Sequence, residues 1–114
     1  MRLVKSFGNA LRGIVKMVQT EKNFQIHIIA LILVTSAGFY FGISKNEWID
    51  ILLVSGAVLM AETFNSSIEN IMDHLHPEQH EKVKMIKDMA AGAVLLLAIT
   101  AVIVAVLIFS PYVK

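Results

Sequence analysis

The sequence has no cysteine and few charged side chains. Of its 114 residues, 17% are charged and 56% are hydrophobic, whereas an average soluble domain is about 25% charged. The lack of cysteine excludes disulfides, thiolate metal sites and cysteine nucleophiles. A net charge of +1 is too small for a nucleic-acid-binding surface, and the apolar content excludes disorder. Two prolines and six glycines give too few turns for a β fold. A small, mostly helical membrane domain remains.

Two apolar segments have the length of membrane-spanning helices. Segment 89–109 contains no charged side chain, and a helix of about 20 apolar residues crosses a bilayer core. Segment 26–43 is near the lower length limit, and its only ionisable side chain is His27, at its start. Aromatic residues close both segments, as interfacial belts do. We therefore predict a transmembrane helix over each.

The segment 48–73 is apolar at first and then acquires regularly spaced polar residues. At about 100° per residue, these polar residues fall on one narrow face of a helix. They are Glu62, Asn65, Ser66, Glu69 and Asp73. Acidic groups at membrane depth are costly unless they face protein or a water-filled cavity. The segment is predicted to be a third transmembrane helix with this stripe turned away from lipid.

The first 22 residues are predicted to form a basic amphipathic helix of the kind that lies on a membrane surface. Eight of the ten basic residues lie before the first span or in the predicted 74–88 loop. The positive-inside rule then places the N-terminus and this loop in the cytoplasm and the C-terminus outside. The predicted fold is an all-α integral membrane protein, with a surface helix and three transmembrane helices, N-in and C-out.

Two acids in the stripe suggest different roles. Glu62 and Glu69 are seven residues apart, about 10 Å along a helix, which is too far for both to hold one metal ion. We expect the deeper Glu62 to handle a proton and Glu69 to bind a cation. Glu21, before the first span, is a candidate second carboxylate, since Mg²⁺ commonly binds one or two carboxylates plus substrate phosphates. Lys87 and Asp88 stand at the mouth of the third span.

Other interpretations of these residues stay open at this point. A buried acid can be a protonated packing element, and Asn65 and Ser66 can be interhelical hydrogen-bonding groups. A transport or pore-forming subunit could use Glu62 and Glu69 as a proton or cation relay. Known nucleotide signatures, such as the P-loop, are absent. The residues alone indicate a small membrane protein with a polar intramembrane site.

The pattern E-x-x-N-S-x-x-E-x-x-x-D over 62–73, followed by K-D-M over 87–89, resembles the small prokaryotic diacylglycerol kinase family. The resemblance covers nearly the whole chain. His27, next to Asn23 and Phe24, is more similar to the undecaprenol kinase branch, whereas Asn9, Gln25 and His27 depart from the diacylglycerol branch.

The resemblance implies a homotrimeric kinase of the bacterial cell membrane, with shared active sites that face the cytoplasm. It implies that the chain transfers the γ-phosphoryl group of ATP to the primary hydroxyl of a lipid alcohol. The expected lipid is undecaprenol, which would become undecaprenyl phosphate, and the alternative substrate is diacylglycerol. Glu62 would be the catalytic base, assisted by Asn65, and would meet the lipid with Asn23 and Phe24. Glu21 and Glu69 would hold Mg²⁺. The residues implied to contact ATP are Arg2, Asn9, Glu21, Glu69, Glu78, His80, Lys87 and Asp88.

Overall fold

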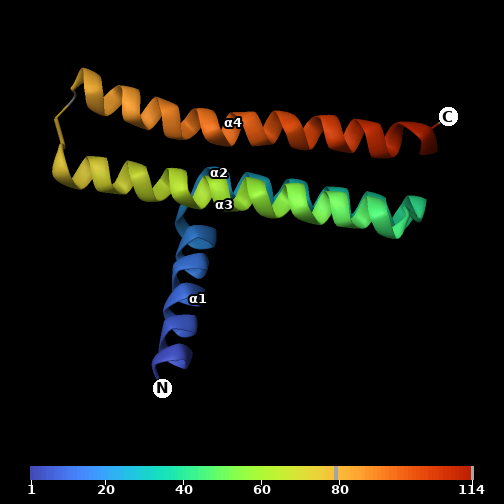
Figure 1. Cartoon of the computed structure of the whole chain (residues 1–114), viewed down its shortest axis with the longest axis horizontal. Helices are drawn as coiled ribbons and strands as arrows, with labels where there is room; N and C mark the ends of the chain where they lie inside the picture. The colour runs from blue at the N-terminus through green and yellow to red at the C-terminus, as the bar shows by residue number, and fades with distance from the viewer. Residues whose placement is uncertain (79, 114) are drawn as a thin grey trace.

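The chain is helical over almost its whole length in the computed structural model, which describes residues 1–78 and 80–113. It forms four α-helices and one short 3-10 helix (Figure 1). These are α1 (Arg2–Thr20), α2 (Lys22–Phe41), α3 (Lys45–Leu75), α4 (Glu81–Phe109) and η1 (Ser110–Tyr112). The described residues contain no strand, so the predicted all-α class is confirmed.

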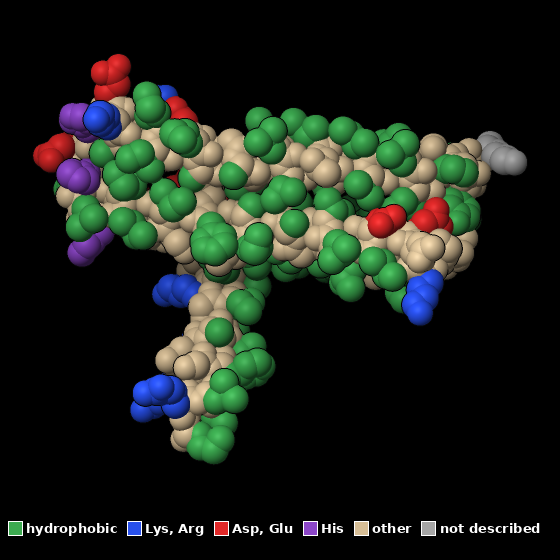
Figure 2. Space-filling view, viewed as in Figure 1, with side chains coloured by type: hydrophobic (Ala, Val, Ile, Leu, Met, Phe, Trp, Pro, Cys, Tyr) green, Lys and Arg blue, Asp and Glu red, His purple; other side chains and the backbone are tan. Residues whose placement is uncertain are grey.

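Three helices, α2, α3 and α4 with η1, are long and apolar enough to cross a membrane. Most of their large hydrophobic side chains are exposed in the isolated chain. Figure 2 shows these side chains along the length of the bundle, with histidines and many charged groups gathered at one end. An apolar exterior of this extent requires lipid or another protein as its surroundings. The prediction of three long apolar helices is confirmed.

The long helices pack side by side, and α1 points away from them. In Figure 1, α3 and α4 run antiparallel and α2 lies behind α3, while α1 leaves the bundle at a steep angle. The change of direction occurs at Glu21, whose backbone is extended, with φ −96° and ψ 107°. One non-helical residue therefore separates the N-terminal amphipathic helix from the bundle. Its predicted position on the membrane surface stays a prediction.

A tight turn joins α2 to α3. Gly42 ends α2 with φ 64°, a left-handed conformation that glycine adopts without steric cost. Ser44 then caps α3, because its hydroxyl accepts from the Glu47 amide at 3.2 Å and the Glu47 carboxylate accepts from the Ser44 amide at 2.9 Å. This reciprocal capping box fixes where α3 begins.

Apolar packing is concentrated near this turn. Ile43, Ile51 and Ile108 form a buried cluster there. The Tyr112 hydroxyl donates to the Glu47 carboxylate at 2.6 Å, which ties the end of the chain to the first turn of α3. The apolar end of the bundle is thus closed by packing and by one polar contact.

The opposite connection is shorter than the predicted 74–88 loop. α3 continues to Leu75 and α4 begins at Glu81, so residues 81–88, expected within the loop, are helical. The start of α4 is fixed by His80, whose Nδ1 accepts from the Lys82 amide at 3.1 Å. A cap of this kind satisfies a free amide of the first turn and lets the helix begin eight residues before the apolar run.

Candidate active site

The polar face of α3 is turned into the protein. Glu62 is 2% exposed, Asn65 5% and Ser66 2%, and these are the buried polar residues in the described part of the chain. Glu69 is half-buried and Asp73 is exposed. We call these five residues the polar stripe. The prediction that the stripe faces protein rather than lipid is confirmed for its deeper half.

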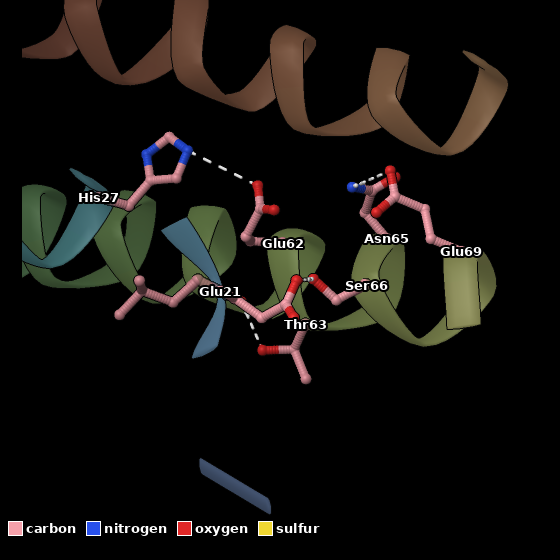
Figure 3. Close-up of polar contacts among 8 residues, drawn as sticks. Glu21, His27, Glu62, Thr63, Asn65, Ser66 and Glu69 are labelled. Carbon is pink, nitrogen blue, oxygen red and sulfur yellow. Dashed lines mark hydrogen bonds and ion pairs between the residues drawn. The ribbon is translucent and has the colours of Figure 1, made fainter. Parts of the chain in front are cut away.

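Each buried member of the stripe has a partner (Figure 3). Glu62 Oε2 lies 3.7 Å from His27 Nε2, and the Ser66 hydroxyl donates to Glu21 Oε1 at 3.0 Å. The Asn65 amide nitrogen donates to Glu69 Oε2 at 3.5 Å. Glu21 reaches α3 because it occupies the break between α1 and α2. The break therefore delivers a second carboxylate to the stripe, where it contacts Ser66; the predicted pairing of Glu21 with Glu69 at a cation stays a prediction.

One oxygen in the stripe has no partner. Asn65 Oδ1 is buried and makes no hydrogen bond within the described residues, an uncommon and costly state for a polar atom. The Asn65 amide nitrogen contacts the Glu69 carboxylate, whereas the Glu21 carboxylate contacts Ser66. The described residues contain no group of three or more acidic or histidine side chains placed to hold a metal. The orphaned amide oxygen and the carboxylate of Glu69 are oxygen donors, which suit a hard cation that also binds substrate oxygens.

A polar pocket of about 240 Å³ lies where α3 and α4 meet their connection. Lys87 Nζ lies 2.7 Å from Asp73 Oδ1 across the two helices. Lys84 Nζ contacts Asp88 at 2.9 Å. The charged residues that line the pocket are Asp73, Glu78, Lys84, Lys87 and Asp88. The structure thus brings three of the residues implied to contact ATP, namely Glu78, Lys87 and Asp88, to one pocket.

Other predicted residues lie apart from this pocket. Arg2 and Asn9 are on α1, which projects away from the bundle (Figure 1), and Asn9 accepts a hydrogen bond from Arg12. His80, by contrast, lies in the connection beside the pocket, where it is exposed and its Nδ1 caps α4. One copy of the chain therefore does not bring all the predicted nucleotide contacts together.

The two lipid contacts on α2 differ in exposure. Asn23 is exposed, whereas Phe24 is 4% exposed. The ring of Phe24 packs inside the protein, which leaves little of it for a lipid to touch.

An apolar pocket of about 400 Å³ lies between α2, α3 and α4. Many of its residues are small or β-branched, which leaves space between the helices. Among the lining residues are His27, Ala30, Val34, Val58, Ala101 and Ala105. His27 lines this pocket and also contacts Glu62. The catalytic candidate is therefore one side chain away from a hydrocarbon-lined space.

The sequence did not predict His27 as part of the site. Its signal was visible, because segment 26–43 contains no acidic side chain, no lysine and no arginine, and His27 is its only histidine; such ionisable groups within spans commonly have a functional partner. The identity of that partner could not be predicted, since it lies on another helix.

The fold and the site together define a class: a small helical membrane protein with a buried acid beside an apolar pocket and a polar, charged pocket at one end. Residues 8–109 match the family described as prokaryotic diacylglycerol kinase. This chain belongs to that family, and the resemblance found in the motifs of 62–73 and 87–89 is confirmed.

Curated relatives share most of the chain. Undecaprenol kinase of Bacillus subtilis (strain 168) is 40% identical over 110 residues, covering 96% of this chain and 89% of the relative. Diacylglycerol kinase of Synechocystis sp. is 36% identical over 90% of this chain and 59% of the relative. Diacylglycerol kinase of Escherichia coli (strain K12) is 30% identical over 90% of this chain and 84% of the relative. The chain is accordingly a membrane lipid kinase.

Proposed function

We propose that this chain transfers the γ-phosphoryl group of ATP to the primary hydroxyl of undecaprenol, giving undecaprenyl phosphate. The observation that carries the proposal is the buried Glu62 carboxylate, 2% exposed, beside an apolar pocket and on the same helix as the half-buried Glu69. The choice of lipid is supported by the 40% identity to a relative named undecaprenol kinase.

The length of α3 separates the two acids by depth. We place the start of α3, with Lys45 and Trp48, near one interface. Measured along the helix from Lys45, Glu62 is about 26 Å away and Glu69 about 36 Å away. The bilayer core is about 30 Å thick. Glu62 therefore stands inside the hydrocarbon edge, where a lipid hydroxyl arrives, and Glu69 stands beyond it, where a nucleotide in water arrives. This division supports separate roles for the two carboxylates.

In the proposed reaction, Glu62 takes the proton of the lipid hydroxyl. The hydroxyl oxygen forms a bond to the γ-phosphorus while the bond from that phosphorus to the bridging oxygen breaks, and ADP leaves. Phosphoryl transfer depends mainly on positioning and charge neutralisation. Lys87 supplies positive charge in the polar pocket, once a phosphate replaces its contact with Asp73. Asn65 lies between the two acids and orients the reacting groups.

The donor set supports Mg²⁺ dependence. Glu21 and Glu69 would hold the ion together with phosphate oxygens, and the unpaired Asn65 Oδ1, on a side chain that contacts Glu69, would be a further oxygen donor. When bound, Mg²⁺ would neutralise charge on the phosphates of ATP. The Ser66 hydroxyl keeps the Glu21 carboxylate against α3, at 3.0 Å, so this carboxylate is held in place by the chain itself.

We also propose that the active site faces the cytoplasm of a bacterial cell and is completed in a homotrimer. The charge distribution supports the orientation, since eight of the ten basic residues fall in segments on one predicted side. The separation of Arg2 and Asn9 from the pocket at Lys87 supports sharing between protomers. A neighbouring copy could bring its α1 to that pocket.

The decisive experiment is a phosphorylation assay with purified protein, undecaprenol, Mg²⁺ and labelled ATP. We expect labelled lipid, and we expect Glu62→Gln to lower kcat by about 10²–10⁴-fold, the usual contribution of a general base. The matched control is Glu81→Gln, the same change at an exposed acid in the first turn of α4, and it should retain full turnover. Full turnover by Glu62→Gln would contradict the proposal.

The lipid is tested separately by giving the enzyme undecaprenol and diacylglycerol side by side. We expect a higher kcat/KM for undecaprenol. A preference for diacylglycerol would replace the proposed substrate and leave the roles of Glu62 and the polar pocket unchanged.

A further inference from the structure

The Glu62 carboxylate has one ion-pair partner within the described residues. Its side chain is 3% exposed and its Oε2 lies 3.7 Å from His27 Nε2. A buried carboxylate without a partner is costly, and such groups are normally paired. The neighbouring acids make other contacts, Glu21 with Ser66 and Glu69 with Asn65. The pairing of His27 with Glu62 is therefore specific to the deepest acid of the stripe.

We propose that His27 is a positioning residue, which holds the Glu62 carboxylate in the orientation that accepts the proton of the lipid hydroxyl. This inference rests on the proposed function of Glu62 as the base. No family resemblance assigns His27 a role, and the structure places it on α2, facing Glu62 on the neighbouring helix α3 (Figure 3).

The distance suits this role. At 3.7 Å the contact exceeds a normal hydrogen bond, so it leaves Oε2 able to accept another donor. The incoming hydroxyl can therefore bind the carboxylate without first displacing His27. The imidazole Nε2–H directed at the carboxylate would favour one rotamer of Glu62 over those that point elsewhere.

The position of His27 also suits a boundary between two environments. Its ring lines the apolar pocket between α2, α3 and α4, and its side chain is 22% exposed. Imidazole has an apolar body and a polar edge, so it can border hydrocarbon on one side and a carboxylate on the other. Lysine at this position would bring a fixed, strongly hydrated charge to the pocket.

The test compares two substitutions of similar size at the same position. His27→Gln keeps an amide nitrogen close to the place of Nε2, whereas His27→Leu fills the space and removes the polar edge. The control is Ile29→Ala, on the same helix, where Ile29 is 57% exposed and is not among the residues that line the pocket. For each protein, kcat and the KM values for ATP and for undecaprenol are measured separately.

We expect His27→Leu to lower kcat by about tenfold to a hundredfold, the effect of misplacing a catalytic group, with the KM for ATP unchanged. His27→Gln should restore most of this kcat, and Ile29→Ala should leave kcat intact. Equal kcat values for His27→Leu and the unsubstituted protein would overturn the inference. So would equal losses in His27→Leu and His27→Gln, because a purely structural role does not depend on the polar edge.

The inference and the proposed function fail differently. If Glu62→Gln is inactive while both His27 variants have normal kcat, Glu62 remains the base and His27 has no positioning role. If Glu62→Gln itself retains full turnover, the base is wrongly assigned and the role of His27 falls with it.

Discussion

Replacing Gly38 with alanine tests the packing that closes the apolar end of the bundle. Gly38 lies on α2 and is buried. A Cβ at this position would stand 2.6 Å from Cη2 and 2.9 Å from Cζ2 of Trp48, and 3.1 Å from Cδ1 of Ile43. Contacts under 3.0 Å are too short for carbon atoms, so the indole must shift by about 1 Å to reach an ordinary separation of 3.5–4.0 Å.

The expected cost follows from two opposing effects. Overpacking a well-packed interior costs about 1–3 kcal/mol, whereas alanine is favoured over glycine inside a helix by about 1 kcal/mol. The net effect of Gly38→Ala is a loss of about 0–2 kcal/mol in the free energy of unfolding. Gly56→Ala is the matched control, because Gly56 lies within α3 and its Cβ would meet nothing within 4 Å. We expect Gly56→Ala to raise stability by up to about 1 kcal/mol.

The assay uses the protein's own fluorophore. Trp48 is the only tryptophan, and its ring packs against Phe39 with centroids 4.9 Å apart. Unfolding in detergent micelles, followed by Trp48 fluorescence, gives the stability of each variant, and the native emission reports whether the indole has moved. Gly38→Ala should shift this emission and Gly56→Ala should not.

The result that refutes this reasoning is specific. If Gly38→Ala is as stable as Gly56→Ala and its native emission is unchanged, then Trp48 does not pack against Gly38 and the arrangement of α2 on α3 is wrong. A loss in Gly38→Ala that is relieved by also changing Trp48→Phe would support the contact, because the smaller ring gives the new methyl group room.

Three other predictions concern the site. Glu69→Gln should raise the Mg²⁺ concentration for half-maximal activity by about tenfold or more, because it removes one of two proposed carboxylate ligands; an unchanged Mg²⁺ titration would contradict the metal role. Arg2→Ala and Lys87→Ala chains, each weakly active alone, should regain activity when co-expressed, since a shared site then contains one intact set of residues; no recovery would argue for sites within one chain. The sequence has no native cysteine, so single cysteines report topology: in intact cells an impermeant maleimide should label Asn46→Cys and spare His76→Cys, and the reverse pattern would invert the proposed orientation.

The two ends of the bundle differ in composition: one is packed with apolar side chains, and the other is polar. One end is closed by Ile43, Ile51 and Ile108, and by the contact of Tyr112 with Glu47. The other end carries the polar pocket and the ion pair of Lys87 with Asp73. Lys87 and Asp73 are partly exposed, and exposed pairs are worth only about 0–1 kcal/mol, so the nucleotide contact proposed for Lys87 would cost little when it replaces this pair.

Much of the architecture could be predicted from the sequence because a membrane leaves few choices. Runs such as 89–109 can satisfy their backbone in hydrocarbon only as a helix. The spacing of Glu62, Asn65 and Glu69 likewise places them on one face of α3, whatever packs against that helix. The cost of exposing acids to lipid then requires this face to turn inward, and it does.

The ends of the helices were harder to predict. Hydropathy indicates where an apolar run begins, but a helix begins where its first amides find a cap. For α4 this cap is His80, which adds residues 81–88 to the helix. In the same way, the extended backbone at Glu21 separates α1 from α2, although both neighbouring segments favour helix.

The sequence by itself determined the three spans, the inward face of α3 and the pair of acids at different depths, because helical periodicity and the cost of charge in hydrocarbon depend on the chain alone. Only the tertiary structure decided which partner each acid has. His27 meets Glu62, Ser66 meets Glu21 and Lys87 meets Asp73 across different helices. Such contacts depend on how helices rotate and slide against one another, which side-chain packing settles and sequence spacing does not record.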